Sequence, residues 1–141
     1  MKKNILLIGK FNSVSKDLQS YLAEYVNVQI CPDNYQRGKS ILSMYEPELI
    51  LISLTDLSGE ISGIFEEIKT KYSHIPVICI GNKAEQQEYM ECIQGGQFQM
   101  LTRPVSNQTV LRHIQKKLGI YEGVKIENEK NRIMEKNIFF W

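Results

Sequence analysis

Short apolar runs that alternate with amphipathic stretches are the feature that most constrains how this 141-residue chain can fold. Five such runs recur along the chain, at residues 4–8, 26–31, 49–52, 76–80 and 98–102. The stretches between and after them carry apolar residues at the three- to four-residue spacing of a helix. Strands that alternate with helices of this length require right-handed crossovers and a parallel sheet. The pattern therefore predicts an α/β domain of five βα units.

The expected arrangement is a doubly wound sandwich of the flavodoxin-like type. Its parallel sheet should have five strands in the order 2-1-3-4-5, the order that suits five such units. The run at 49–52 is the most apolar, so it is expected in the centre, where helices cover both faces of a strand. In this arrangement a binding site lies at the carboxyl ends of the strands, around strands one and three.

Capping signals mark where several helices begin and end. Asp33 with Gln36, and Asn82 with Glu85, show the spacing of capping boxes for the second and fourth helices. The fourth helix is predicted to run to the glycine pair at 95–96. The proline at 104 and the two residues after it are expected to begin the last helix.

The chain is predicted to divide into a domain at residues 1–118 and a C-terminal tail at 119–141. The tail is charged and carries Ile126, Ile133 and Phe140 at a seven-residue spacing. Three positions are too few for a coiled coil, which needs three or four heptads. Two alternatives stay open. The tail is a helix that packs back on the domain, or it is a connector or dimerisation helix that leads to an output domain or partner.

Composition excludes several classes of protein. Seventeen basic and sixteen acidic residues give a net charge of +1, whereas nucleic-acid-binding domains usually present a strongly basic face. No run approaches the 18 or so apolar residues of a membrane span. The apolar run at residues 5–8 is too short for the hydrophobic region of a signal peptide. Cys31, Cys79 and Cys92 lack metal-ligand spacing and are expected to be reduced, mainly buried thiols. We therefore expect a cytoplasmic location, without membrane or direct nucleic-acid binding.

The order of these motifs resembles the receiver domain of two-component response regulators, the CheY-like domain, over residues 4 to about 118. The landmarks are NILLIGK, PELILISL, PVICIGN and GGQFQMLTRPVS, which contain four of the predicted strands. The last is the most specific, because receivers carry a glycine, a strand with an aromatic residue and then Lys-Pro at this place. Pro47, Pro76, Gly96 and Pro104 also stand where the family usually has them.

In that family, two acidic residues after the first strand help bind Mg²⁺, and an aspartate that ends the third strand accepts the phosphoryl group. A threonine or serine ends the fourth strand, and a lysine precedes the proline after the fifth. Carried over position by position, the acidic pair corresponds to Gly9 and Lys10, and the acceptor corresponds to Ser53. Gly81 stands at the threonine or serine position and Arg103 at the lysine position. Only Arg103 keeps the character of the family residue.

The resemblance therefore implies a pocket that has lost its phosphorylation chemistry. A divalent cation of this kind prefers oxygen ligands, carboxylates above all, and positions 9, 10 and 53 supply no carboxylate. Asp56 is close in sequence, but it is expected to project away from the pocket. Met100 stands at the position of the aromatic residue that changes rotamer in the family. With Gly81 at the hydroxyl position, the chain lacks both the hydroxyl that follows the phosphoryl group and the aromatic ring that it moves, so the usual two-state switch is not expected.

We accordingly predict a pseudo-receiver: a non-catalytic regulatory domain without metal or cofactor that acts through protein contacts in two-component signal transduction. Receivers commonly use the face formed by the fourth helix, fifth strand and fifth helix. Here that face is expected to include Glu88, Tyr89, Arg112, Gln115 and Lys116. Its mixed charge suits a partner protein, an output domain or a second copy of the chain, and equally suits plain exposure to solvent.

The alternative function is an anion or small-molecule sensor. Lys10 and Arg103 are expected to converge near Ser53, which would leave the former phosphorylation pocket positively charged. Against this, both cations could be solvated, or paired with Asp56 and Glu60. His74 and His113 have no triad or metal partner in the sequence, and both are expected at the surface.

Overall fold

A computed structural model describes residues 2–10, 13–31, 34–55, 57 and 62–119. All five strands are parallel and form one sheet in the order β2-β1-β3-β4-β5, so the predicted flavodoxin-like arrangement is confirmed. The strands are β1 (Asn4–Ile8), β2 (Asn27–Cys31), β3 (Leu49–Ser53), β4 (Val77–Gly81) and β5 (Phe98–Thr102). The helices are α1 (Ser13–Leu22), α2 (Tyr35–Tyr45), α3 (Ser62–Lys71), α4 (Lys83–Glu88) and α5 (Asn107–Leu118).

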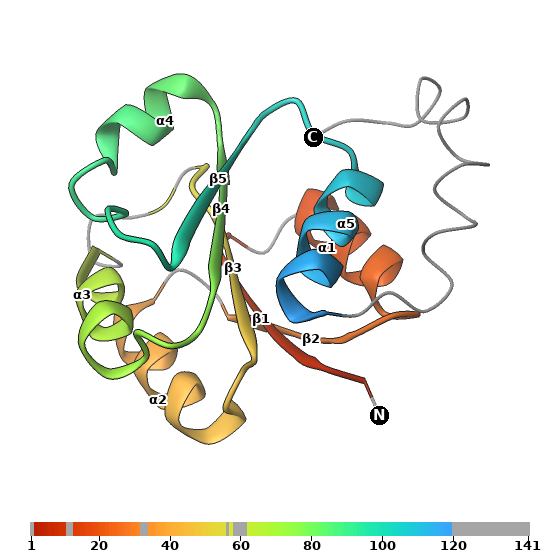
Figure 1. Cartoon of the computed structure of the whole chain (residues 1–141), viewed down its shortest axis with the longest axis horizontal. Helices are drawn as coiled ribbons and strands as arrows, with labels where there is room; N and C mark the ends of the chain where they lie inside the picture. The colour runs from red at the N-terminus through yellow and green to blue at the C-terminus, as the bar shows by residue number, and fades with distance from the viewer. Residues whose placement is uncertain (1, 11–12, 32–33, 56, 58–61, 120–141) are drawn as a thin grey trace.

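The helices cover the two faces of the sheet in two groups. Figure 1 shows α1 and α5 on one face and α2, α3 and α4 on the other. Successive residues of a strand point to opposite faces, so each strand contributes to both cores. In β1, Leu6 and Ile8 join the core beneath α2 and α3, while Ile5 and Leu7 join the core beneath α1 and α5. This double coverage explains why the central strands read as continuous apolar runs.

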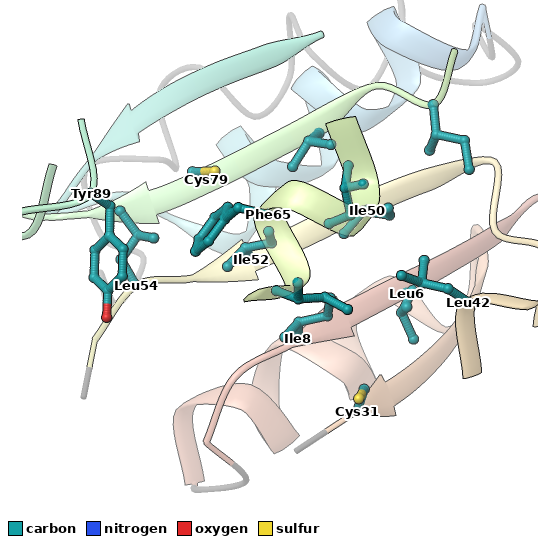
Figure 2. Packing of buried hydrophobic residues seen from close by; sticks show 14 residues of the cluster. Leu6, Ile8, Cys31, Leu42, Ile50, Ile52, Leu54, Phe65, Cys79 and Tyr89 are labelled. Carbon is teal, nitrogen blue, oxygen red and sulfur yellow. The ribbon is translucent and has the colours of Figure 1, made fainter. Parts of the chain in front are cut away.

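The core on the α2–α3 side is organised around an aromatic pair. Phe65 of α3 is 1% exposed, and its ring centroid lies 5.6 Å from that of Tyr89. Ile52 and Leu54, at and just after the end of β3, belong to the same cluster (Figure 2). This packing places the end of β3 and the turn that follows α4 against one apolar core.

The structure confirms one predicted cap and corrects another. Helix α4 begins with a capping box: the Asn82 side chain accepts from the Glu85 amide, and the Glu85 side chain accepts from the Asn82 amide, each at 2.8 Å. For α2 the N-cap is Asn34, whose side-chain oxygen accepts a 3.0 Å hydrogen bond from the amide of Arg37. The box predicted from Asp33 is therefore wrong at this helix, and Asp33 lies outside the described residues.

Helix α4 is shorter than predicted. It ends at Glu88, and turns follow it instead of a helix that continues to the glycine pair at 95–96. Tyr89 turns into the core against Phe65, whereas Met90 is 48% exposed. The apolar residues that suggested a longer helical face therefore do not share one face, and local turns bury those that need burial.

Helix α5 and the three cysteines can be compared with their predicted positions, whereas the predicted division at residue 118 stays a prediction. Helix α5 ends at Leu118, with Gly119 in the left-handed conformation (φ 68°) as its C-cap, a position that favours glycine. The predicted tail lies almost entirely outside the described residues. Cys31 and Cys79 are buried and Cys92 is half-buried, and all three are free thiols. Within the described ranges, no helix is long and apolar enough to cross a membrane.

Candidate functional site at the carboxyl ends of the strands

The predicted site lies where the carboxyl ends of β1, β3, β4 and β5 meet, and its first feature is a close approach of two strand ends. Gly9 follows β1, and its amide donates a 3.1 Å hydrogen bond to the carbonyl oxygen of Cys31. A Cβ atom added at Gly9 would lie 3.1 Å from the Cβ of Ser53. Position 9 is therefore packed against the position that corresponds to the acceptor, and a larger residue there would force one of the two strand ends to move.

Arg103 is the central cation of the site. Its backbone amide donates to the carbonyl oxygen of Gly81 at 3.1 Å, which joins the ends of β4 and β5. Its guanidinium Nη2 donates a 2.7 Å hydrogen bond to the hydroxyl oxygen of Ser53. The structure thus brings Ser53, Gly81 and Arg103 together as predicted. The Ser53 hydroxyl acts as a hydrogen-bond acceptor for the Arg103 guanidinium.

The second partner of this cation is Glu85, which the sequence indicates only as a capping residue. Arg103 Nη1 lies 3.8 Å from Oε1 of Glu85, and the two side chains are 18% and 16% exposed. The Glu85 carboxylate also accepts a 3.4 Å hydrogen bond from the hydroxyl of Thr55. A single carboxylate oxygen therefore connects the start of α4, the loop after β3 and the cation after β5.

Gly81 explains why the Glu85 carboxylate can lie there. A Cβ atom added at Gly81 would lie 3.1 Å from Glu85 Oε1 and 3.1 Å from both Cβ and Cδ1 of Leu54. The volume that a side chain at position 81 would take is thus occupied by the Glu85 carboxylate and by Leu54. The signal in the sequence was a glycine at a strand end, followed at the third helical position by a glutamate long enough to fold back.

The remaining predicted site residues have different outcomes. Lys10 is exposed just beyond β1, and its convergence on Ser53 and Arg103 stays a prediction. Asp56 and Glu60 lie outside the described residues, so their pairing with the cations stays a prediction as well. Met100 is half-buried in β5, pairs in register with Cys79 and packs against the core beneath α3 and α4.

The predicted interaction face is smaller than expected. Glu88 and Lys116 are exposed and Arg112 is half-buried, but Tyr89 is 8% exposed and Gln115 only 3%. Tyr89 packs on Phe65, and Gln115 lies one helical turn beyond the buried Leu111 on the inward side of α5. Including these two residues in an exposed face was therefore wrong.

His113 is also less exposed than predicted, whereas His74 lies at the surface. The side-chain amide nitrogen of Gln99 lies 2.8 Å from Nδ1 of His113. Burial lowers the pKa of His113 below its usual value, and the positive charges of Lys116, Arg112 and Lys117 lower it further. An amide donor facing Nδ1 suits a neutral ring, in agreement with this direction. Among the described residues, no cluster of three His, Cys, Asp or Glu side chains could hold a metal ion.

The comparisons with known proteins point to one fold. No family model matches this chain, and no curated protein matches it. Among solved structures, the chain is similar to the N-terminal signal receiver domain of a two-component response regulator from Bacteroides fragilis. The TM-score is 0.67 and the identity 21%, over 82% of this chain and 97% of that one.

Two further structures give the same result. The signal receiver domain of a histidine kinase from Syntrophus aciditrophicus has a TM-score of 0.65 and 20% identity, over 87% of this chain and 92% of that one. The receiver domain of NtrX from Brucella abortus has a TM-score of 0.68 and 15% identity, over 82% and 98% of the respective chains. At these identities the likeness establishes that the chain has the fold of receiver domains.

Proposed function

We propose that this chain is a degenerate receiver domain that is not phosphorylated and regulates through protein–protein contacts in two-component signalling. One observation carries the proposal. The guanidinium at the retained cationic position already contacts the hydroxyl of Ser53 at 2.7 Å and the carboxylate of Glu85 at 3.8 Å. The cation is held by side chains of the domain itself, in the place where receivers of the family present a cation to a phosphoryl group.

The residue types at the strand ends support the same conclusion. Transfer of a phosphoryl group to a receiver needs a nucleophilic carboxylate and oxygen ligands for Mg²⁺. Gly9, Lys10 and Ser53 supply neither a carboxylate nor a second anionic ligand. A serine hydroxyl becomes a good nucleophile only when a base removes its proton. Here the hydroxyl oxygen of Ser53 accepts a hydrogen bond from a cation, which withdraws electron density from it.

Incubation with a small phosphodonor and Mg²⁺, followed by intact-protein mass spectrometry, tests the proposal. We expect no gain of a phosphoryl group. The variant Ser53→Asp should also remain unmodified, because it restores the acceptor type without metal ligands at positions 9 and 10. A receiver domain with its acidic residues in place serves as the positive control. A phosphoryl adduct on the wild-type chain would overturn the proposal.

The contacts are proposed at the part of the α4–β5–α5 face that stays accessible, which includes Glu88, Arg112 and Lys116. Its mixed charge suits a polar, reversible interface with a partner, an output domain or a second copy of the chain.

A further inference from the structure

Glu85 has two roles in the structure: it caps helix α4, and it forms an ion pair with the Arg103 guanidinium. We propose that Glu85 is an internal carboxylate ligand of the Arg103 guanidinium, and that a small phosphate-type oxyanion binds this guanidinium by displacing it. Because Glu85 also caps α4, such displacement would change how the start of that helix is held. The inference rests on the proposed function in one respect, that the pocket carries out no covalent phosphoryl transfer.

The contact between the two side chains is loose enough to be replaced. Arg103 Nη1 and Glu85 Oε1 are 3.8 Å apart, which is an ion pair without a hydrogen bond. The other guanidinium nitrogen makes a close 2.7 Å bond to Ser53. An oxyanion that carries several oxygens can accept two guanidinium hydrogen bonds at about 2.7–2.9 Å. It can therefore gain a directional interaction that Glu85 does not make.

The low exposure of the pair favours an anion in the place of the Glu85 carboxylate when that carboxylate moves away. The two side chains are 18% and 16% exposed, so their charges are only weakly screened by salt. Separating the Glu85 carboxylate from a largely buried guanidinium is costly unless another negative charge takes its place. When the carboxylate moves away, it also leaves the space beside Gly81 that it now occupies. A Cβ atom added at Gly81 would lie only 3.1 Å from Oε1 of Glu85. The incoming oxyanion thus finds the positive charge of Arg103 and the volume that the Glu85 carboxylate has left.

Helix α4 is the element that would respond. It has six residues, none of them buried, so apolar packing contributes little to its position. Polar contacts hold it instead: the Asn82–Glu85 capping box, and the Gln86 side chain, which donates to Gly81 O at 3.1 Å and to Thr102 Oγ1 at 2.8 Å. Glu85 Oε1 is the acceptor for the Asn82 amide at 2.8 Å. An anion that draws Arg103 away from Glu85 therefore acts directly on the first turn of α4.

A titration with inorganic phosphate at constant ionic strength, followed by amide NMR, tests the inference on the full chain. The informative variant is Glu85→Gln, which removes the competing charge while a glutamine still completes the capping box. We expect its apparent affinity for phosphate to be about ten-fold higher than that of the wild type, the scale of one charged hydrogen bond. In the wild type, phosphate should also shift the Asn82 amide, because its acceptor moves.

The matched control is Glu91→Gln, which removes an equal charge from an exposed position in the turn that follows the same helix. Its phosphate affinity should equal that of the wild type, and Arg103→Gln should abolish the response. Equal gains in the two glutamine variants would overturn the inference, because they would reflect net charge alone. No binding to Glu85→Gln, or binding that persists without Arg103, would also overturn it. Both glutamine variants keep side-chain shape, so the comparison does not depend on whether Arg103→Gln folds.

Inorganic phosphate has no transferable phosphoryl group, so this titration reports only noncovalent binding. A negative result would leave the proposed function standing, whereas a covalent adduct in the phosphodonor experiment would overturn that function independently.

Discussion

Replacing Gly81 by alanine should destabilise the domain, because the strand end at this position has no room for a Cβ atom. The added atom would lie 3.1 Å from Cβ and Cδ1 of Leu54 and 3.1 Å from Oε1 of Glu85. The carboxylate is the end of a flexible side chain and can withdraw. Leu54 cannot withdraw as easily, because it is 1% exposed and its backbone amide donates a 2.8 Å hydrogen bond to the Ile80 carbonyl oxygen.

The expected magnitude comes from two opposing effects. Overpacking a well-packed site typically costs about 1–3 kcal/mol, while exchanging glycine for alanine reduces the entropy of the unfolded chain and stabilises by roughly 0.4–1 kcal/mol. We therefore expect Gly81→Ala to lower the free energy of unfolding by about 1–2 kcal/mol. The ion pair between Arg103 and Glu85 should loosen as well, since the carboxylate is the side that can move.

Gly96→Ala is the matched control. A Cβ atom at Gly96 meets nothing within 4 Å, and its φ lies outside the left-handed region, so only the stabilising effect on the unfolded chain remains. In urea denaturation, with a slope of about 2 kcal/mol per molar, the midpoints of the two variants should differ by roughly 1 M. If Gly81→Ala is as stable as Gly96→Ala, the close packing at Gly81 does not constrain the domain and the reasoning is refuted.

Two further predictions concern reactivity and pH. Burial raises the pKa of Cys79 to about 12, and Cys31 is buried as well. In the native protein a thiol reagent should therefore label Cys92 first, and should label Cys31 and Cys79 only on unfolding. Early labelling of Cys79 would contradict this prediction. The folded-state pKa of His113 is lowered, chiefly by burial, so the unfolded chain binds the proton more readily. The stability that His113 contributes should be present above its unfolded pKa of about 6.5 and lost as the pH falls through the folded value. Urea midpoints measured across this range should fall less in His113→Gln, and an identical slope in both proteins would contradict the assignment.

The sequence determined the architecture because the information that specifies it is local and periodic. Continuous apolar runs fixed the central strands, and helical spacing fixed the elements between them. The capping box of Asn82 and Glu85 and the start of α5 could be predicted for the same reason, since a cap acts within one helical turn. The cap of α2 is a case where local signals compete: Asn34 and Asp33 are both good N-caps, and the chain uses Asn34.

The sequence by itself also determined that positions 9, 10 and 53, which the resemblance to receivers places at the carboxyl ends of β1 and β3, carry no carboxylate, because residue identity is enough to show it. Only the tertiary structure decided which side chains meet at these strand ends. Glu85 and Arg103 come from different βα units, and they meet because parallel strands end at one edge of the sheet. Whether a long side chain folds back or extends into solvent depends on the space and charge around it. That space is set by Gly81 and Leu54, whose contact does not exist until the sheet is assembled.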